Sequence, residues 1–364
     1  MKIGKATAAY ERWLGRRLTL IKRDIELKHQ HMKEALFPFL RATYYRWAQA
    51  WPEVSPGTAA APAVLAVGDL HVENFGTWRD IEGRLIWGIN DFDEAWRLPY
   101  TNDLVRLATS AHLAIAEQHL SLQAQEACDA IAEGYAEALG NAGRPGGRAF
   151  VLAEHHSVLR KMAVERLHNP ESYWEKLKSL PTLEEKIPAG ARRAMERMMP
   201  ERGLEMRIVH RIAGLGSLGR QRFLALAEWR GGTVAREAKA LAPSACVWAA
   251  KGGGSAKILY QEIVDRAVRA PDPFVRLKKR WIVRRLAPDC SRIELAALPK
   301  ERDEIRLLHA MGFETANVHL GSGEPRAIRA DLKKRGRRWL HRAAQEMAEA
   351  VERDWKDWRK ASGA

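Results

Sequence analysis

Three aspartates and one asparagine are the residue types that could hold a metal ion beside a phosphoryl group. Asp69 and Asn74 lie five positions apart, and Asp91 and Asp93 follow in a second acidic segment. Carboxylate and amide oxygens are the ligands that Mg²⁺ takes, with phosphate oxygens of a substrate often completing its coordination. Phosphoryl transfer needs that metal and a carboxylate that orients the attacking hydroxyl. Each side chain alone could simply cap a turn, but together they predict a metal-dependent phosphoryl-transfer site.

Two apolar runs come just before these polar side chains and predict β-strands. Residues 63–67 (AVLAV) lead into Gly68, and residues 84–89 (RLIWGI) lead into Asn90. Short apolar runs bounded by turn residues are typical of buried strands. We expect the two strands to be neighbours, because neighbouring strands would bring both polar segments into one cleft.

A glycine-rich segment, residues 214–219 (GLGSLG), lies much later in the chain. Residues 205–213 before it and 222–229 after it alternate between apolar and polar side chains, which predicts strands. A dinucleotide-binding loop would be followed by a helix, whereas this loop joins two predicted strands. Kinases fold such a glycine-rich hairpin over the phosphates of ATP. The residues predicted to contact ATP here are Gly214, Gly216, Ser217 and Gly219.

A third predicted strand, residues 233–241 (TVAREAKAL), carries two basic candidates for phosphate binding, Arg236 and Lys239. A kinase places a basic side chain on its third strand to contact the phosphates. Side chains three positions apart on a regular strand point to opposite faces, so the sequence leaves the choice between them open. Glu262, on a predicted helix over residues 255–269, is the expected partner of the chosen base.

The coarse pattern is helical, then strand-rich, then helical, which predicts an α+β chain. We expect residues 1–202 to form a mainly helical catalytic lobe with the acidic segments. Residues 203–290 are expected to form a small β-rich lobe that covers the nucleotide. Residues 291–364 are expected to add helices that complete the catalytic lobe.

The composition is that of a globular protein, with 46% hydrophobic and 29% charged residues among 364. The net charge of +15 favours anionic ligands such as nucleotides, and it suggests an anionic acceptor. Three widely separated cysteines argue against a disulfide scaffold and against a zinc knuckle. No apolar run approaches the roughly 20 residues that span a bilayer, and the first residues lack the apolar core of a signal peptide. We therefore expect a cytoplasmic protein with no membrane partner.

Several segments together resemble the family known as domain of unknown function 2252 (DUF2252). The most specific are residues 68–76 (GDLHVENFG) and 90–95 (NDFDEA). Shorter matching segments are residues 39–45, 102–110, 214–219, 236–238 and 283–286. The resemblance therefore extends over most of the chain.

The two specific segments are also similar to the catalytic core of aminoglycoside phosphotransferases and other kinase-like enzymes. This resemblance implies a role for each polar side chain. The implied roles are a catalytic base at Asp69, a loop-bracing side chain at His71, metal ligands at Asn74, Asp91 and Asp93, and a supporting buried carboxylate at Asp103.

The order of the segments is inverted relative to kinases, in which the glycine loop precedes the catalytic loop. The resemblance therefore implies a two-lobed, protein-kinase-like fold that is circularly permuted, a change that folds with nearby termini tolerate. The family's usual Lys-Glu-Ala reads Arg-Glu-Ala at residues 236–238. By that alignment Arg236 takes the lysine position, with Lys239 as its substitute.

The leading hypothesis is an ATP- and Mg²⁺-dependent phosphotransferase that transfers the γ-phosphoryl group to a hydroxyl of a small-molecule acceptor. A nucleotidyl transferase could use the same parts with ATP bound in reverse. A metallophosphoesterase is an alternative, because Asp69-Leu70-His71 follows an apolar strand, although the Gly-Asn-His segment of that fold is missing. A non-catalytic nucleotide or nucleic-acid binding protein is suggested by the basic residues 276–285 and 333–342. We expect Trp281 and Trp339 in those segments to pack inward instead.

Overall fold

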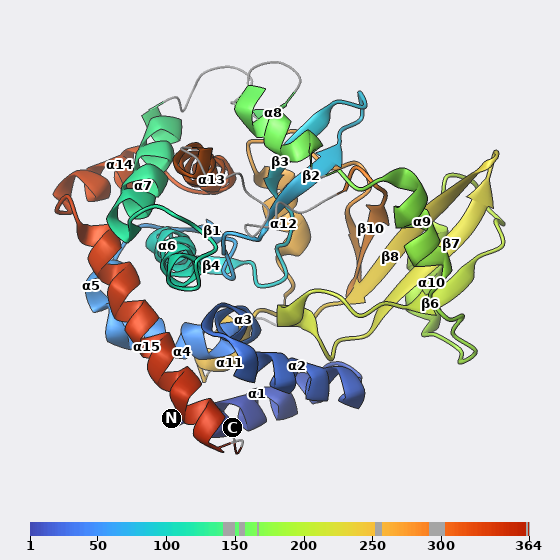
Figure 1. Cartoon of the computed structure of the whole chain (residues 1–364), viewed down its shortest axis with the longest axis horizontal. Coiled ribbons are helices and arrows are strands. Elements are labelled where there is room, and N and C mark those ends of the chain that lie inside the picture. Colours follow the sequence, from blue (N-terminus) through green and yellow to red (C-terminus); the bar gives the residue numbers. More distant parts are fainter. Residues whose placement is uncertain are drawn as a thin grey trace.

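The computed structural model describes residues 1–140, 150–152, 157–165, 167–251, 257–290, 303–361 and 363. Helices and small sheets make up one side of the molecule, and a larger antiparallel sheet makes up the other (Figure 1). The predicted α+β class is therefore confirmed. The first two residues of the helix predicted over 255–269 lie outside the described residues. So does residue 291, where the third predicted domain segment begins.

The helical side combines segments from both ends of the sequence. Its helices are α1 (Ile3–Gly15), α2 (Lys22–Glu34), α3 (Leu36–Ala42), α4 (Tyr44–Val54), α5 (Pro56–Ala59), α6 (Thr101–Ala116), α7 (Ala124–Gly140), α13 (Asp303–Leu320), α14 (Pro325–Lys334) and α15 (Trp339–Ala361). Helix α15 packs against α1, α4 and α6. The contact is made by buried side chains spaced so that they lie on one face of the helix: Leu340, Ala343, Ala344, Met347 and Val351.

Helices α7 and α13 cross at unusually close range. A Cβ atom added at Gly134 would lie 1.9 Å from the backbone oxygen of His309, and one at Gly312 would lie 2.0 Å from that of Ile131. The two glycines therefore let the helix backbones touch, in the way that small residues permit close packing.

The larger sheet has five antiparallel strands in the order β6-β7-β8-β10-β9. Their bounds are β6 (Arg207–His210), β7 (Arg222–Trp229), β8 (Gly232–Ala240), β9 (Arg276–Lys278) and β10 (Trp281–Leu286). The strands predicted from alternation over residues 205–213, 222–229 and 233–241 are all present. Helix α9 (Pro170–Lys178) packs Leu177 on one face, and helix α10 (Ala189–Glu196) packs Ala191 and Ala194 on the other. The period of two along β7 and β8 supplies apolar side chains to both faces.

Two smaller sheets carry the acidic segments. Strand β1 (Ala63–Ala66) pairs with β4 (Trp96–Pro99), and β3 (Leu85–Ile89) pairs with β2 (Phe75–Arg79) and β5 (Phe150–Val151). The prediction that the strands at residues 63–67 and 84–89 are neighbours is therefore wrong. The short strands β2 and β4, which the apolar runs did not reveal, are their actual partners.

The described part of the chain also holds a 3-10 helix, Leu215–Ser217, within the glycine-rich segment, and three short α-helices. The three α-helices are α8 (Ser157–Val164), α11 (Ala245–Ala249) and α12 (Tyr260–Arg266). Helix α12 lies inside the helix predicted over residues 255–269 and is shorter. Trp281 is buried, as predicted, with its ring 5.8 Å from that of Phe223.

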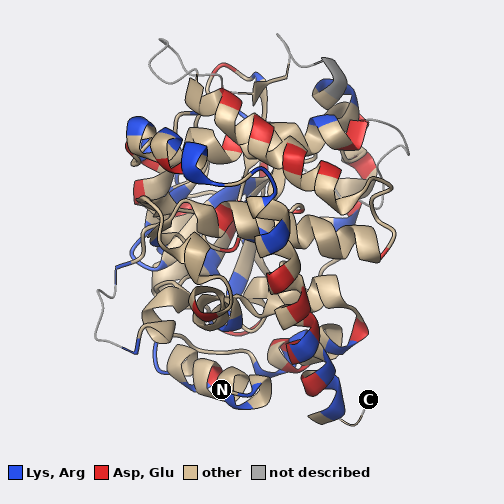
Figure 2. Ribbon diagram, turned by 90° about the vertical axis from the view of Figure 1, so that its left-hand side faces the viewer, with Lys and Arg blue, Asp and Glu red and all other residues tan. Residues whose placement is uncertain are grey.

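Figure 2 shows Lys and Arg interspersed with Asp and Glu along the helices that face the viewer. Within the described residues, no helix has both the length and the apolar character that crossing a bilayer requires.

Candidate active site

The loop that follows β1 is held by the buried carboxylate of Asp103, at the start of α6. One Asp103 oxygen accepts a hydrogen bond from the backbone N–H of Val67 (2.6 Å), and the other accepts one from Gly68 (2.9 Å). His319 Nε2 lies 2.9 Å from the same carboxylate. Gly68 has a φ of +83°, and a Cβ there would lie 2.4 Å from the backbone oxygen of Glu94. Only glycine therefore permits this turn and its contact with the second acidic segment.

Asp69 comes next, and its carboxylate is oriented by Arg106 from α6. The guanidinium of Arg106 donates two hydrogen bonds to Asp69 Oδ1, at 3.1 and 2.6 Å. The other oxygen, Oδ2, faces the glycine loop, since it lies 3.5 Å from a Cβ position built on Gly216. Burial raises the pKa of Asp69 above its usual value, although the charge of Arg106 opposes the shift. A carboxylate fixed on one side and facing a cavity on the other can orient a hydroxyl group.

Asn74 links the two acidic segments through its side-chain amide. Its Nδ2 donates to the backbone oxygens of Asp69 (3.2 Å) and Asp91 (3.1 Å). The backbone N–H of Asn90 donates to the backbone oxygen of Asn74 at 3.1 Å. Asn74 Oδ1 is buried and has no hydrogen-bond partner among the described residues. Buried polar oxygens are nearly always bonded, so this oxygen is suited to accept a ligand.

Asp91 and Asp93 share the ammonium group of Lys239, which reaches them from β8. Lys239 Nζ lies 2.6 Å from Asp93 Oδ2 and 3.3 Å from Asp91 Oδ2. The other Asp93 oxygen is buried without a hydrogen-bond partner in the described part of the chain. Burial, reinforced by the charge of Asp91, raises the pKa of Asp93 to about 6, against the opposing charges of Lys239 and Arg220. The ammonium group of Lys239 therefore lies where the carboxylates of Asp91 and Asp93 converge.

The glycine loop joins β6 to β7 and lies directly over this group. Lys28 Nζ donates to the backbone oxygen of Gly216 at 3.3 Å, and the backbone N–H of Ile21 donates to that of Gly219 at 2.8 Å. Ser217 donates its hydroxyl to the Gly214 oxygen at 3.1 Å and accepts from Arg222 at 2.7 Å. The loop is therefore held by the N-terminal helices on one side and by its own sheet on the other.

One cavity lies between the loop and the acidic side chains, and its volume is ≈ 50 Å³. At about 10–15 Å³ for each water position, it has room for a few water molecules. The predicted site residues that line it are Asp69, His71, Asn74, Asp91, Asp93, Gly214, Gly216 and Ser217. Lys28, Arg41 and Arg220 add positive charge to the same walls. Segments far apart in the sequence thus meet in one polar cavity.

Two predicted residues lie away from this cavity. Arg236 points to the face of β8 opposite to Lys239, where it donates to the Met198 backbone oxygen at 2.6 Å and lies over the ring of Phe274. Glu262 pairs with Lys257 at 2.8 Å near the surface instead of with a base on β8. Of the two basic candidates, the structure therefore brings Lys239 to the acidic residues.

The remaining predicted side chains support the loops. His71 Nδ1 accepts a hydrogen bond from the Glu73 backbone N–H at 3.2 Å, and its ring packs edge-on against Phe37. Asp103, described above, holds the backbone at residues 67 and 68. Gly219 has a φ of +90° and packs against Ile25.

Several side chains at the site were not assigned from the sequence. Glu94 accepts from Arg220 at 2.9 Å and from the backbone N–H of Ala245 at 2.6 Å, which ties the second acidic segment to the end of the glycine loop and to the helix Ala245–Ala249. Glu94 and Arg106 lie inside segments 90–95 and 102–110, which resemble the DUF2252 family. That resemblance was the sequence feature that could have identified them. Lys28 lies in an ordinary amphipathic helix, and nothing in its sequence neighbourhood marks it.

Residues 18–180 match the model of the DUF2252 family, which is described as an uncharacterized protein conserved in bacteria. The matched segment includes both acidic segments, and the match supports the family resemblance there. Comparisons with the curated proteins and with the solved structures find no match. The family description states no activity, so the function has to be argued from the site.

Proposed function

We propose that this protein is a Mg²⁺- and ATP-dependent phosphotransferase that acts on the hydroxyl of an acceptor. The observation that carries the proposal is the convergence of one oriented carboxylate, one amide oxygen, two carboxylates and one lysine ammonium beneath a glycine loop. The groups concerned are Asp69, Asn74, Asp91, Asp93 and Lys239. These are the parts that phosphoryl transfer requires.

The arrangement of the sheet supports a kinase-like, circularly permuted fold. In protein kinases the glycine-rich loop precedes the third strand, and that strand carries the lysine that meets the phosphates. Here the glycine loop joins β6 and β7, and Lys239 lies on the third strand, β8. The acidic loops at residues 68–94 come earlier in the chain, and α13 to α15 follow the sheet. A circular permutation is the simplest proposal that reconciles this order with a kinase.

The donor set fits magnesium. The oxygens Asn74 Oδ1 and Asp93 Oδ1 are both buried and lack a hydrogen-bond partner among the described residues, and Asp91 adds a carboxylate beside them. Hard oxygen ligands of this kind suit Mg²⁺ better than a soft metal. When bound, Mg-ATP supplies the transferable phosphoryl group and the metal charge that offsets its oxygens.

The chain's own residues then have separate tasks. Asp69, held on one oxygen by Arg106, orients the acceptor hydroxyl and takes its proton. Lys239 exchanges its contacts with Asp91 and Asp93 for phosphate oxygens. Lys28 and Arg220 add positive charge under the glycine loop. The acceptor binds next to Asp69 Oδ2, the oxygen that faces the cavity.

We propose that this cavity enlarges when nucleotide binds. The cavity has room for a few water molecules, and we propose that the glycine loop moves away from Asp69 to admit the triphosphate. Enzymes that close glycine-rich loops over their substrates show motions of this kind.

Calorimetry tests the proposal directly. ATP, ADP and AMP are titrated with and without Mg²⁺ into the wild type, Asp91→Ala and the exposed control Asp357→Ala. We expect Mg²⁺-dependent ATP binding that Asp91→Ala weakens at least about 10-fold, equivalent to about 1.4 kcal/mol, while the control matches the wild type. Equal affinities in all three proteins would contradict the proposal.

The products distinguish the alternatives. Phosphotransfer releases ADP, nucleotidyl transfer releases pyrophosphate, and a phosphoesterase acts without nucleotide. Phosphoesterases of the dinuclear type need several His and carboxylate ligands. The cluster of three His, Cys or acidic ligands that the described residues contain lies outside this cavity.

A further inference from the structure

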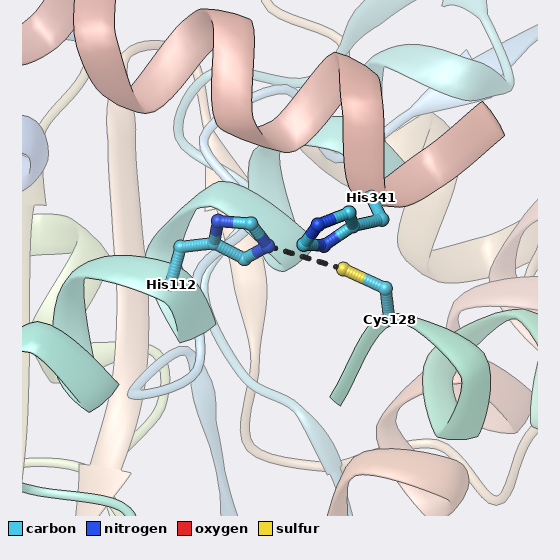
Figure 3. Close-up of side chains that lie close together, drawn as sticks. All are labelled: His112, Cys128 and His341. Atoms are coloured by element: carbon cyan, nitrogen blue, oxygen red, sulfur yellow. Dashed lines mark hydrogen bonds between the residues drawn. The ribbon is translucent and has the colours of Figure 1, made fainter. Parts of the chain in front are cut away.

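Three helices bring two histidines and a cysteine together outside the candidate active site (Figure 3). His112 lies on α6, Cys128 on α7 and His341 on α15. One ligand atom from each residue lies within 4.8 Å of the other two, and His112 Nε2 is 3.4 Å from Cys128 Sγ. The two imidazole rings have their centroids 5.1 Å apart. Cys128 is buried, and both histidines are half-buried, so the group is covered but can be reached from solvent.

The distance between Cys128 Sγ and His112 Nε2, which are hydrogen-bonded in this structure, also fits two ligands of one tetrahedral metal ion. Zinc binds thiolate sulfur at about 2.3 Å and imidazole nitrogen at about 2.0–2.1 Å, so a tetrahedral sulfur and nitrogen lie about 3.6 Å apart. The observed 3.4 Å from Cys128 to His112 is close to that value. Thiolate with imidazole is the donor set that borderline-soft metals prefer.

One further observation favours a ligand for His341. Its Nδ1 atom is buried without a hydrogen-bond partner in the described part of the chain. Buried polar atoms without a partner are uncommon in native structures and call for an explanation.

We propose that His112, Cys128 and His341 bind one zinc ion, with water as the fourth ligand. The site is separate from the acidic cavity. His112 is nine residues after Asp103 on α6, a distance of about 14 Å at 1.5 Å per residue. The ion joins α6, α7 and α15, and α6 is the helix that holds Asp103 and Arg106 against the catalytic loop. In this proposal the ion ties α6 to α7 and α15, and binding releases the thiol proton of Cys128.

Cobalt substitution tests the proposal on the full-length protein. Metal-free protein is titrated with Co²⁺, and the absorption spectrum is recorded. We expect one equivalent to give a thiolate-to-cobalt charge-transfer band with strong visible bands of a tetrahedral ion, and Zn²⁺ to displace both. Co²⁺ held only by the carboxylates of the acidic cavity would give no thiolate band. Absence of that band in the folded wild type would overturn the proposal.

Variants assign the band to this cluster. Cys128→Ser should abolish it, and His341→Ala should weaken Zn²⁺ binding by more than about 100-fold, beyond the loss typical of residues outside the ligand set. Cys290→Ser removes one thiol elsewhere and should leave the spectrum unchanged. Circular dichroism establishes that each variant is folded, and Zn²⁺ should raise the melting temperature of the wild type and Cys290→Ser only. A band that survives Cys128→Ser, or disappears in Cys290→Ser, would show that the cluster is not the metal site.

Discussion

Lys28 is a buried cation whose position costs stability. Burial, with the nearby charge of Arg220, lowers the pKa of Lys28 to about 8. Its ammonium donates to the Gly216 backbone oxygen at 3.3 Å and lines the cavity. Strongly perturbed pKa values cluster at functional sites. The buried position of Lys28 therefore fits a site that binds an anionic ligand.

Replacing Lys28 by methionine should stabilise the protein in a pH-dependent way. The unfolded state binds the proton more tightly than the folded state, so the charged form costs about 3 kcal/mol below pH 8. That cost falls to zero as pH rises from about 8 to about 10.5. We therefore expect Lys28→Met to gain up to about 3 kcal/mol at pH 7 and little at pH 10, measured by denaturant unfolding.

A gain at pH 10 as large as that at pH 7 would contradict this account. The variant should also bind Mg-ATP more weakly than the wild type if the ammonium meets a phosphate. Stabilisation accompanied by lost function is common at such positions.

Lys239 and Arg236 offer a comparison on one strand. Lys239→Met removes the ammonium shared by Asp91 and Asp93 and leaves Arg220, 3.6 Å from Asp93 Oδ2, as the cation beside them. Breaking a buried pair costs about 3–5 kcal/mol. We expect a lower melting temperature for this variant and at least a 10-fold loss of ATP affinity, or about 1.4 kcal/mol. Arg236→Met should leave ATP affinity unchanged because Arg236 faces away from the cavity. Calorimetry in which only Arg236→Met lost affinity would reverse the assignment.

The contact of α7 with α13 depends on glycine at the crossing. Gly134→Ala puts a methyl group 1.9 Å from the His309 backbone oxygen, so the helices must separate. We expect a loss of about 3 kcal/mol or more, at the upper end of the cost of overpacking. Gly140→Ala at the end of the same helix meets nothing within 4 Å and should change stability by less than about 1 kcal/mol. Similar melting temperatures for the two variants would argue against a tight crossing.

Alternating and helical patterns predicted the long elements, because a buried face leaves a readable period. Strands β7 and β8 were found in this way. The four-residue strand β4 was not, because Trp96–Pro99 is too short to show a period and is defined by its pairing with β1. Because the short partner strands β2 and β4 were not recognised, β1 and β3 were wrongly predicted to be neighbours.

At the scale of the whole molecule, we propose that the glycine loop moves away from the acidic cavity to admit the nucleotide and then closes over it. Mg-ATP should therefore change amide hydrogen exchange most at residues 214–219 and 68–76. We expect slower exchange in both segments once the loop closes over the phosphates. Protection confined to other parts of the protein would place the nucleotide elsewhere.

The sequence predicted which polar residues gather at the candidate site better than it predicted how they are held. Asp69, Asn74, Asp91 and Asp93 were recognised because they stand in two compact segments. The pairing of Asp103 with His319 and the approach of Lys28 to the glycine loop join residues about 190 to 220 positions apart. Such contacts follow from the complete fold and leave no local pattern.

The packing of α1 on α15 has a consequence for biosynthesis. During translation α1 leaves the ribosome long before its partner helix exists, and Asp103 is made 216 residues before its partner His319. The helical side therefore cannot close until synthesis has passed α15, and its apolar faces are exposed meanwhile. Chains whose early segments depend on late ones fold slowly and are prone to aggregate before completion. Protection of the nascent chain by a chaperone would matter more here than for a protein that folds from its N-terminus onward.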